Sequence, residues 1–361
     1  MKTTVLAAAA AILVLGGAAL FFVNRPVRLP PPSGPYGVSS RVLHLPADRS
    51  ALATPIAEIW YPTSPDRGLA AGREAAMPVL IYLPGWDGAA VEDLFLIHDL
   101  VSHGIVVTSL RYPTASEVAA GRRRGVALRV EVPGGLDFSS QQAFDRTRAL
   151  GDEKVRSRAR NVAAVLDQLT RLNEDRGSEL FGRLDLDHLG AWGFSFGGAA
   201  AAQAAWQDRR IKAVANLDGW LFADAALQGV PCPYLVLGDG SPLPSAADLA
   251  ASEPTRRYSA IFDMEDYRRQ VAGLTRYGGF LVTIDGTDHV NFSDAATRSS
   301  FRGLTGAGAI DPARALVITA AYLREFFKSS WFGQPAPLLE HDPPAYPEVH
   351  VKVFGRSDAG S

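Results

Sequence analysis

The chain has 361 residues, of which 47% are hydrophobic and 20% charged, and a formal net charge of −2. This composition is typical of a well-cored globular protein and excludes a disordered chain. The length allows two average domains or one large α/β domain. The balanced charge argues against nucleic acid as a partner. The one cysteine, Cys232, excludes an internal disulfide and a cysteine-based metal site.

The N-terminal segment predicts an element that anchors or targets the chain. Every residue from Val5 to Val23 is apolar or glycine, and a helix of that length nearly spans a bilayer. The run ends in bulky residues and not in a small-x-small cleavage site. We therefore favour an uncleaved membrane anchor over residues 1–24, with a cleaved signal peptide as the alternative. The Pro-rich residues 25–36 are interpreted as a stiff linker that holds the domain off the bilayer.

Alternating apolar patterns predict a body of strands and helices over residues 37–330. Strands are expected at residues 38–45, 56–61, 77–83, 105–110, 188–192, 211–217, 234–238 and 279–284. Helices are expected at residues 94–101, 141–172, 199–206 and 312–327. This order predicts an α/β fold with a mostly parallel sheet covered on both faces. Active sites of such sheets lie at the carboxyl ends of the strands.

Three further segments do not fit this alternation. Residues 111–138 are polar and contain glycine, so no regular structure is expected there. Residues 240–278 form a long insertion that is either a helical cap over the site or a surface helix. Residues 331–361 are interpreted as a Pro-rich C-terminal tail.

A Gly-Phe-Ser-Phe-Gly sequence at 193–197 follows one predicted strand and precedes an alanine-rich helix. Strand, sharp turn and helix with a serine at the apex is the arrangement of a nucleophile elbow. Glycine is required at positions 193 and 197 because a Cβ there would collide with the neighbouring strand or helix. We interpret Ser195 as a nucleophile, and a structural turn serine is the alternative.

A serine hydroxyl is a weak nucleophile, so it needs a base that a third group holds in place. His289 follows Ser195 in the chain and stands at the end of a predicted core strand, which makes it the candidate base. Asp218 and Asp239 each end a predicted strand and are candidate acids. Each also precedes a glycine, so a simple turn role is the alternative.

Four segments carry a family resemblance. They are PGWDG at 84–88, GFSFGGAAA at 193–201, NLDGWLF at 216–222 and DHVNFSD at 288–294. In this order they resemble the platelet-activating-factor acetylhydrolase and dienelactone hydrolase-like branch of the α/β-hydrolases. The resemblance implies an α/β-hydrolase fold, with a twisted, mostly parallel sheet, and it favours Asp218 over Asp239 as the acid. The chain departs from the family at Phe194, where histidine is usual, and at Pro84, where His-Gly is common.

The oxyanion hole is expected at two backbone N–H groups, those of Trp86 and Phe196, and such donors stabilise a tetrahedral intermediate by about 3 kcal/mol each. The side chains of Trp86, Phe194, Trp220 and Phe222 are the candidate substrate-binding surface, with a plain core role as the alternative. The sequence has no phosphate-binding loop and no zinc-type histidine spacing, so neither a cofactor nor a metal is expected.

These patterns predict a serine hydrolase that cleaves a small-molecule or lipid-like carboxylic ester through an acyl-enzyme. The alternatives are an amidase or peptidase on the same fold and a non-catalytic envelope scaffold. Analogy with secreted relatives places the catalytic domain outside the cytoplasm, either anchored to the cell membrane or, after cleavage, secreted or periplasmic. The sequence sets no oligomeric state.

Overall fold

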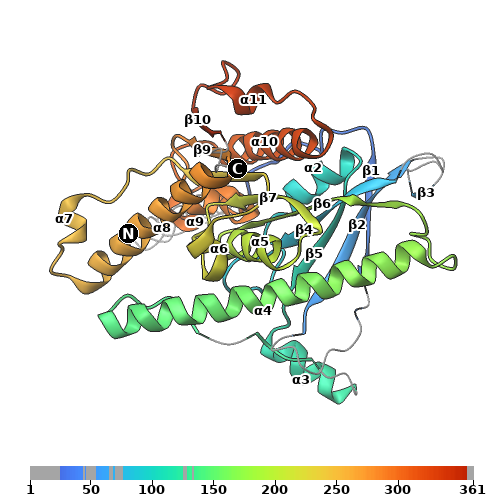
Figure 1. The fold of residues 1–361 in the computed structure, drawn as a ribbon, viewed down its shortest axis with the longest axis horizontal. Coiled ribbons are helices and arrows are strands. Elements are labelled where there is room, and N and C mark those ends of the chain that lie inside the picture. Colours follow the sequence, from blue (N-terminus) through green and yellow to red (C-terminus); the bar gives the residue numbers. More distant parts are fainter. Residues whose placement is uncertain are drawn as a thin grey trace, which may run out of the picture.

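The structure is a computed structural model that describes residues 25–43, 45, 54–64, 68–69, 76–124, 128–131 and 134–355. Its centre is a ten-stranded sheet in the order β1-β2-β5-β4-β6-β7-β8-β9-β10, with β3 paired to β2 (Figure 1). Neighbours from β5 to β9 are parallel, whereas β1, β2 and β10 run antiparallel to their partners. The strand bounds are Gly37–Leu43, Ile56–Ser64, Gly68–Leu69, Met77–Leu83, Val106–Arg111, Leu184–Phe194, Ile211–Leu217, Tyr234–Asp239, Gly279–Ile284 and Val349–Phe354.

Helices cover both faces of this sheet. Alternate residues of β4 point to opposite sides, so Ile81 and Leu83 join one core and Leu80 and Tyr82 the other. Helices α4 (Gln141–Glu174) and α5 (Phe196–Gln207) close the first core, and α2 (Leu94–Ser102) and α10 (Pro312–Phe332) close the second (Figure 1). The central strands read as near-continuous apolar runs because both of their faces are buried.

Shorter helices occupy the connections between these elements. They are α3 (Ala115–Arg123), α6 (Ala223–Gln228), α7 (Ala246–Leu249), α9 (Arg302–Thr305) and α11 (Pro337–Glu340), with the 3-10 turns η1 (His289–Phe292) and η2 (Asp294–Thr297). The longer α8 (Pro254–Tyr277) fills most of the insertion before β9. The predicted alternation of strands and helices is confirmed.

The structure differs from the sequence interpretation in two connecting segments. Residues 111–138, expected to lack regular structure, contain α3, which begins with a capping box between Thr114 and Glu117. Within the segment interpreted as a tail, Val349–Phe354 forms β10 and pairs antiparallel with β9. The proline-rich surroundings concealed this strand, which completes the sheet at its edge.

Residues 25–36, interpreted as a linker, hydrogen-bond to the body of the domain. The Val27 N–H donates to the Thr297 carbonyl, and the Tyr36 N–H donates to that of Ser102. The hydroxyl of Ser33 donates to Asp99, a carboxylate that is almost fully buried. A buried carboxylate needs such partners, so this stretch packs along the surface.

Residues 1–24, for which an apolar anchor helix was expected, lie outside the described residues. In the part of the chain that the structure describes, no helix has the length and apolar character needed to cross a membrane.

Candidate active site

Ser195 sits at a strained turn between β6 and α5. Its backbone has φ 56° and ψ −127°, a conformation that non-glycine residues rarely adopt. A Cβ on Gly193 would lie 2.5 Å from the Leu83 carbonyl oxygen, and one on Gly197 would lie 2.0 Å from it. Both glycines are therefore required by close packing, as the sequence predicts for a nucleophile elbow.

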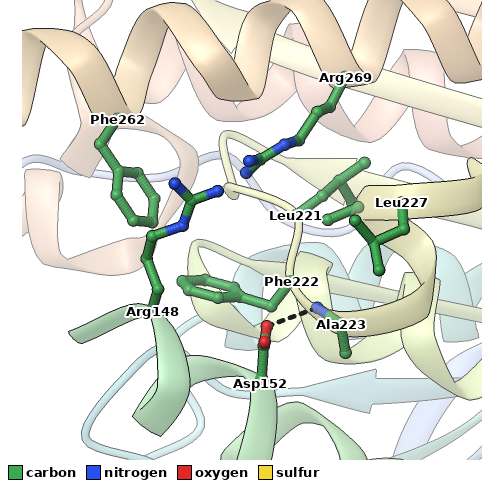
Figure 2. A pocket seen from close by; sticks show the side chains of 9 residues that line it. Arg148, Asp152, Leu221, Phe222, Ala223, Leu227, Phe262 and Arg269 are labelled. Carbon is green, nitrogen blue, oxygen red and sulfur yellow. Dashed lines mark hydrogen bonds between the residues drawn. The ribbon is translucent and has the colours of Figure 1, made fainter. Parts of the chain in front are cut away.

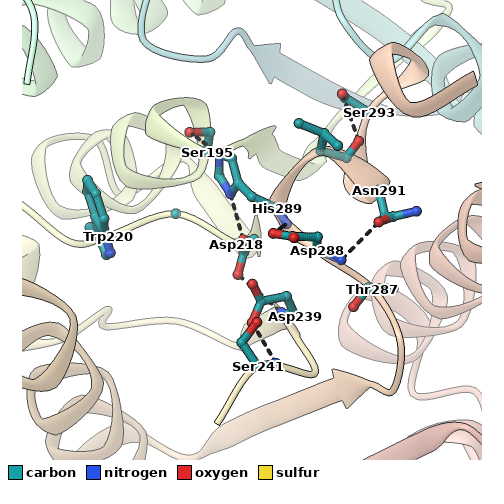
Figure 3. A network of polar contacts seen from close by, with 12 residues as sticks. Ser195, Asp218, Trp220, Asp239, Ser241, Thr287, Asp288, His289, Asn291 and Ser293 are labelled. Carbon is teal, nitrogen blue, oxygen red and sulfur yellow. Dashed lines mark hydrogen bonds and ion pairs between the residues drawn. The ribbon is translucent and has the colours of Figure 1, made fainter. Parts of the chain in front are cut away.

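The structure brings Ser195, His289 and Asp218 together from three separate strand ends. His289 Nε2 lies 2.9 Å from Ser195 Oγ, and His289 Nδ1 lies 2.6 Å from Asp218 Oδ2 (Figure 3). A carboxylate only accepts hydrogen bonds, so Nδ1 carries the proton, and in a neutral ring Nε2 then accepts from the serine hydroxyl. This arrangement has the geometry of a nucleophile, a base and an orienting acid.

Asp239, the alternative acid, has a different position. Its backbone N–H donates to Asp218 Oδ1 over 3.2 Å, and its carboxylate accepts from the Ser241 N–H over 3.0 Å (Figure 3). Asp239 thus holds the second oxygen of Asp218 in place through its main chain. Asp218 is the carboxylate that contacts the histidine.

The carboxylates around His289 determine its protonation. Burial by itself lowers the pKa of His289, but the hydrogen bond and charge of Asp218 raise it, and the charges of Asp239 and Asp288 add to this effect. The net result is a pKa above the ordinary value of a histidine. The site therefore favours the imidazolium that forms when the ring accepts a proton from a nucleophile.

The two residues that carry the expected oxyanion donors are neighbours in the structure. Phe196 is the first residue of α5, where backbone N–H groups have no partner within the helix. Trp86 lies in the turn after β4, which the Gly88 N–H closes by donating to the Gly85 carbonyl over 3.1 Å. The Trp86 and Phe196 rings meet edge to face with centroids 4.6 Å apart. Among the described residues, neither backbone N–H has an acceptor.

The candidate substrate-binding side chains differ in what they expose. Phe194 packs on the ring of His289, with centroids 4.7 Å apart, and is buried, as is Phe222. Trp86 and Trp220 are only partly buried, so each keeps part of its side chain exposed. The aromatic cluster continues into residues that the prediction did not include in the site: Phe138, Phe144, Tyr258 and Phe262.

A pocket of about 70 Å³ lies behind the loop that follows Asp218, lined among others by Arg148, Phe222 and Arg269 (Figure 2). Ligand pockets are commonly about 300–1,000 Å³, so this one is too small for an ester substrate. Asp152 also lines this pocket and accepts from the Ala223 N–H over 2.7 Å. Across the described residues, no cluster of His, Cys, Asp or Glu could hold a metal ion.

The parallel sheet, the strained serine elbow and the Ser–His–Asp contacts define an α/β-hydrolase with the geometry of a hydrolytic site. Comparison with known proteins agrees. A family model described as PET hydrolase-like matches residues 145–292. A ferulic acid esterase from Streptomyces cinnamoneus superposes with a TM-score of 0.63 at 25% identity, covering 92% of this chain and all of that one.

Two relatives by sequence carry an esterase and an acetylhydrolase name. A probable 1-alkyl-2-acetylglycerophosphocholine esterase of Arthroderma benhamiae is 23% identical over 293 residues, which is 77% of this chain and 67% of that protein. The platelet-activating factor acetylhydrolase of Canis lupus familiaris is 23% identical over 212 residues, 54% of this chain and 43% of that protein. The chain belongs to the α/β-hydrolase superfamily, and these findings support a carboxylic ester hydrolase.

The raised pKa of His289 leads to a prediction about pH. Catalysis needs the neutral ring, so kcat/KM should fall as the pH drops through a value above 6.5, the ordinary pKa of histidine. The Asp239→Asn variant removes one of the charges that raise the pKa, so its acid limb should move to lower pH. A pH profile of kcat/KM for both proteins measures this. An acid limb at or below pH 6.5 in the parent would contradict it.

The contacts of the two aspartates lead to a second prediction. Asp218→Asn should lower kcat by about a thousandfold or more, because an amide in that place no longer fixes the tautomer of His289. Asp239→Asn should cost much less, since its main-chain N–H still holds the residue at 218. Steady-state rates on a nitrophenyl ester give the ranking, and the reverse order would reassign the acid to Asp239.

Proposed function

We propose that the protein is a serine hydrolase that cleaves carboxylic esters through an acyl-enzyme, with Ser195, His289 and Asp218 as its catalytic triad. The observation that carries this proposal is the chain of two hydrogen bonds, 2.9 Å and 2.6 Å long, that joins the serine to the histidine and the histidine to the aspartate. The esterase names of the relatives support the choice of an ester bond.

The first half of the proposed reaction forms the acyl-enzyme. Ser195 Oγ attacks the ester carbonyl carbon while its proton passes to His289 Nε2, and Asp218 stabilises the resulting imidazolium. The carbonyl oxygen becomes an oxyanion that accepts from the N–H groups of Trp86 and Phe196. When the intermediate collapses, the C–O bond breaks and His289 returns the proton to the leaving alcohol.

Water completes the cycle. It takes the place of the alcohol and gives a proton to His289 Nε2 as it attacks the acyl carbon. The second tetrahedral intermediate uses the same two N–H donors. Its collapse releases the carboxylic acid, and Ser195 regains its proton from the histidine.

The side chains beside the triad favour an apolar or aromatic ester. Trp86 is partly buried and its ring contacts those of Phe196 and Phe222. Trp220 is partly buried against Phe262, and aromatic rings offer a large apolar area for binding. The relatives' names span PET hydrolase-like, ferulic acid and acetylglycerophosphocholine esterases. We propose a small-molecule or lipid-like ester within this range as the substrate.

Catalysis is favoured over the scaffold alternative because of the backbone of Ser195. A φ of 56° at a non-glycine residue costs about 1–3 kcal/mol and is retained where it serves a site. A scaffold that only binds has no need for a serine raised on such a turn.

A fluorophosphonate probe tests the nucleophile. The full-length protein should be labelled and should hydrolyse nitrophenyl esters, and Ser195→Ala should lose both properties because the probe bonds to the serine oxygen. Comparing short and long acyl chains then measures the size of the acyl site. A folded parent that neither reacts with the probe nor turns over would leave the scaffold alternative.

We also propose that residues 1–24 anchor the protein in the cell membrane with the hydrolase domain outside the cytoplasm. The apolar run from Val5 to Val23 supports this. At the start of the described chain, the Arg25 carbonyl accepts from the Ser300 N–H, and the nearby Phe301 and Leu304 are 54% and 61% exposed. Exposed residues of this kind suit a domain that rests near lipid.

Cell fractionation tests the anchor. The intact chain should remain with membranes after a high-salt wash and should be released by detergent, because the apolar run holds it through hydrophobic contact. N-terminal sequencing of the mature protein provides the control. A soluble mature chain that begins beyond Phe22 would show that the segment is a cleaved signal peptide.

A further inference from the structure

Arg158 lies in the middle of α4, and its side chain is fully buried. Its guanidinium donates to three successive carbonyls of the turn after β4, those of Pro84, Gly85 and Trp86. The distances are 2.9 Å to the Gly85 oxygen and 3.1 Å to the Trp86 oxygen. The same group lies 4.8 Å from the centre of the Phe196 ring. One buried cation thus contacts both residues whose N–H groups are the proposed oxyanion donors.

Two further charged side chains support this arginine. Glu131 accepts from Arg158 Nε and Nη2 over 2.7 Å and 2.8 Å, a bidentate pair. Lys154, one turn before Arg158 on α4, donates to the Trp86 carbonyl over 3.1 Å and to Glu131 over 3.2 Å. Its ammonium lies 4.5 Å from the centre of the Trp86 ring. A buried arginine without such a partner would be strongly destabilising, so Glu131 makes this position tenable.

The geometry of the peptide bond connects these contacts to the oxyanion hole. In a trans peptide, the C=O of one residue and the N–H of the next point in opposite directions, and the described residues contain no cis peptide bond. The Gly85 carbonyl points at Arg158, so the Trp86 N–H points away from it. On the preceding peptide, the Gly85 N–H donates to Glu92 Oε2 over 2.8 Å. The turn is therefore held from both sides, and its Trp86 N–H has no acceptor among the described residues.

We propose that Arg158, paired with Glu131 and assisted by Lys154, is a positioning residue that fixes the Trp86 N–H in the orientation an oxyanion requires. This inference rests on the proposed function, because it assigns a cause to the geometry of that oxyanion hole. Arg158 acts through the turn and does not touch the substrate. Three converging carbonyls repel one another, and a planar guanidinium with several donors satisfies all of them at once, which a lysine ammonium cannot do in the same geometry.

Arg158→Lys in the full-length protein tests the proposal, because it keeps the positive charge and removes the planar guanidinium with its several donors. We expect kcat to fall about 100-fold, the loss typical of one oxyanion donor, with little change in KM, since the contact forms only in the transition state. The affinity for a boronic acid, which mimics the tetrahedral intermediate, should fall in parallel.

Arg324→Lys is the matched control. Arg324 pairs with the buried Asp99 between α10 and α2, on the opposite face of the sheet. This variant should lose stability while keeping kcat and boronate affinity close to those of the parent. A folded Arg158→Lys variant that loses no more kcat than Arg324→Lys would overturn the proposal.

Two further measurements cover the remaining outcomes. If Arg158→Lys does not fold, Lys154→Met removes one of the donors to the Trp86 carbonyl and should lower kcat about tenfold, a part of the full donor effect; an unchanged kcat would count against the proposal.

Amide hydrogen exchange over residues 84–88 tests the turn without any catalysis. It should be faster in Arg158→Lys or Lys154→Met than in Arg324→Lys, and equal exchange would overturn the proposal even in an inactive parent. If exchange is faster in these variants but the probe does not label the parent, the serine hydrolase proposal is rejected. The proposal that Arg158 fixes the turn at residues 84–88 would still stand.

Discussion

The close approach of α5 to the end of β4 is the constraint on which the rest of the site depends. Gly197 packs directly on the Leu83 carbonyl, at a distance that admits no Cβ. This contact seats the serine elbow against the last residue of β4, so the turn that follows, with Trp86, lies beside Phe196. The two residues proposed to supply the oxyanion donors, which lie far apart in the sequence, thereby become neighbours. A bulkier residue at position 197 would push the Ser195 turn away from the end of β4 and from Trp86.

The insertion before β9, for which a helical cap or a surface helix was expected, contacts the loop after Asp218. Helix α8 packs against the loop after Asp218 and holds it through polar contacts: Asp263 accepts from the Trp220 indole, Asp266 from the Leu221 N–H, and Gln270 donates to the Gly219 carbonyl. Burial raises the pKa of Asp266 to about 7 and that of Asp263 to about 6. The helix thus holds the loop that follows Asp218 and carries Trp220, and because several of its own residues are buried it is not a plain surface helix.

The parts of the site that were predicted are those with local sequence signals. Ser195 has its glycines and flanking pattern, and His289 stands alone after a core strand. The choice between Asp218 and Asp239 could not be made from residues alone, because both end neighbouring parallel strands and differ only in which carboxylate reaches the histidine. The sequence does mark Arg158, because it follows Val155 by three residues on the apolar stripe of α4. A charged side chain on such a stripe must have a buried partner. Glu131 offers no such pattern, since it lies in an irregular segment.

The charges around the site are divided in the way the proposed reaction requires. On one side, buried Arg158 and Lys154 lie behind the turn that carries Trp86. On the other, Asp218, Asp239 and Asp288 raise the pKa of His289. Attack on an ester creates a negative oxygen and a positive imidazolium at the same moment, and fixed charges that match both need no reorganisation during the step. In the proposed reaction these carboxylates and cations contact no substrate, and each of them acts through a backbone turn or a ring nitrogen that does.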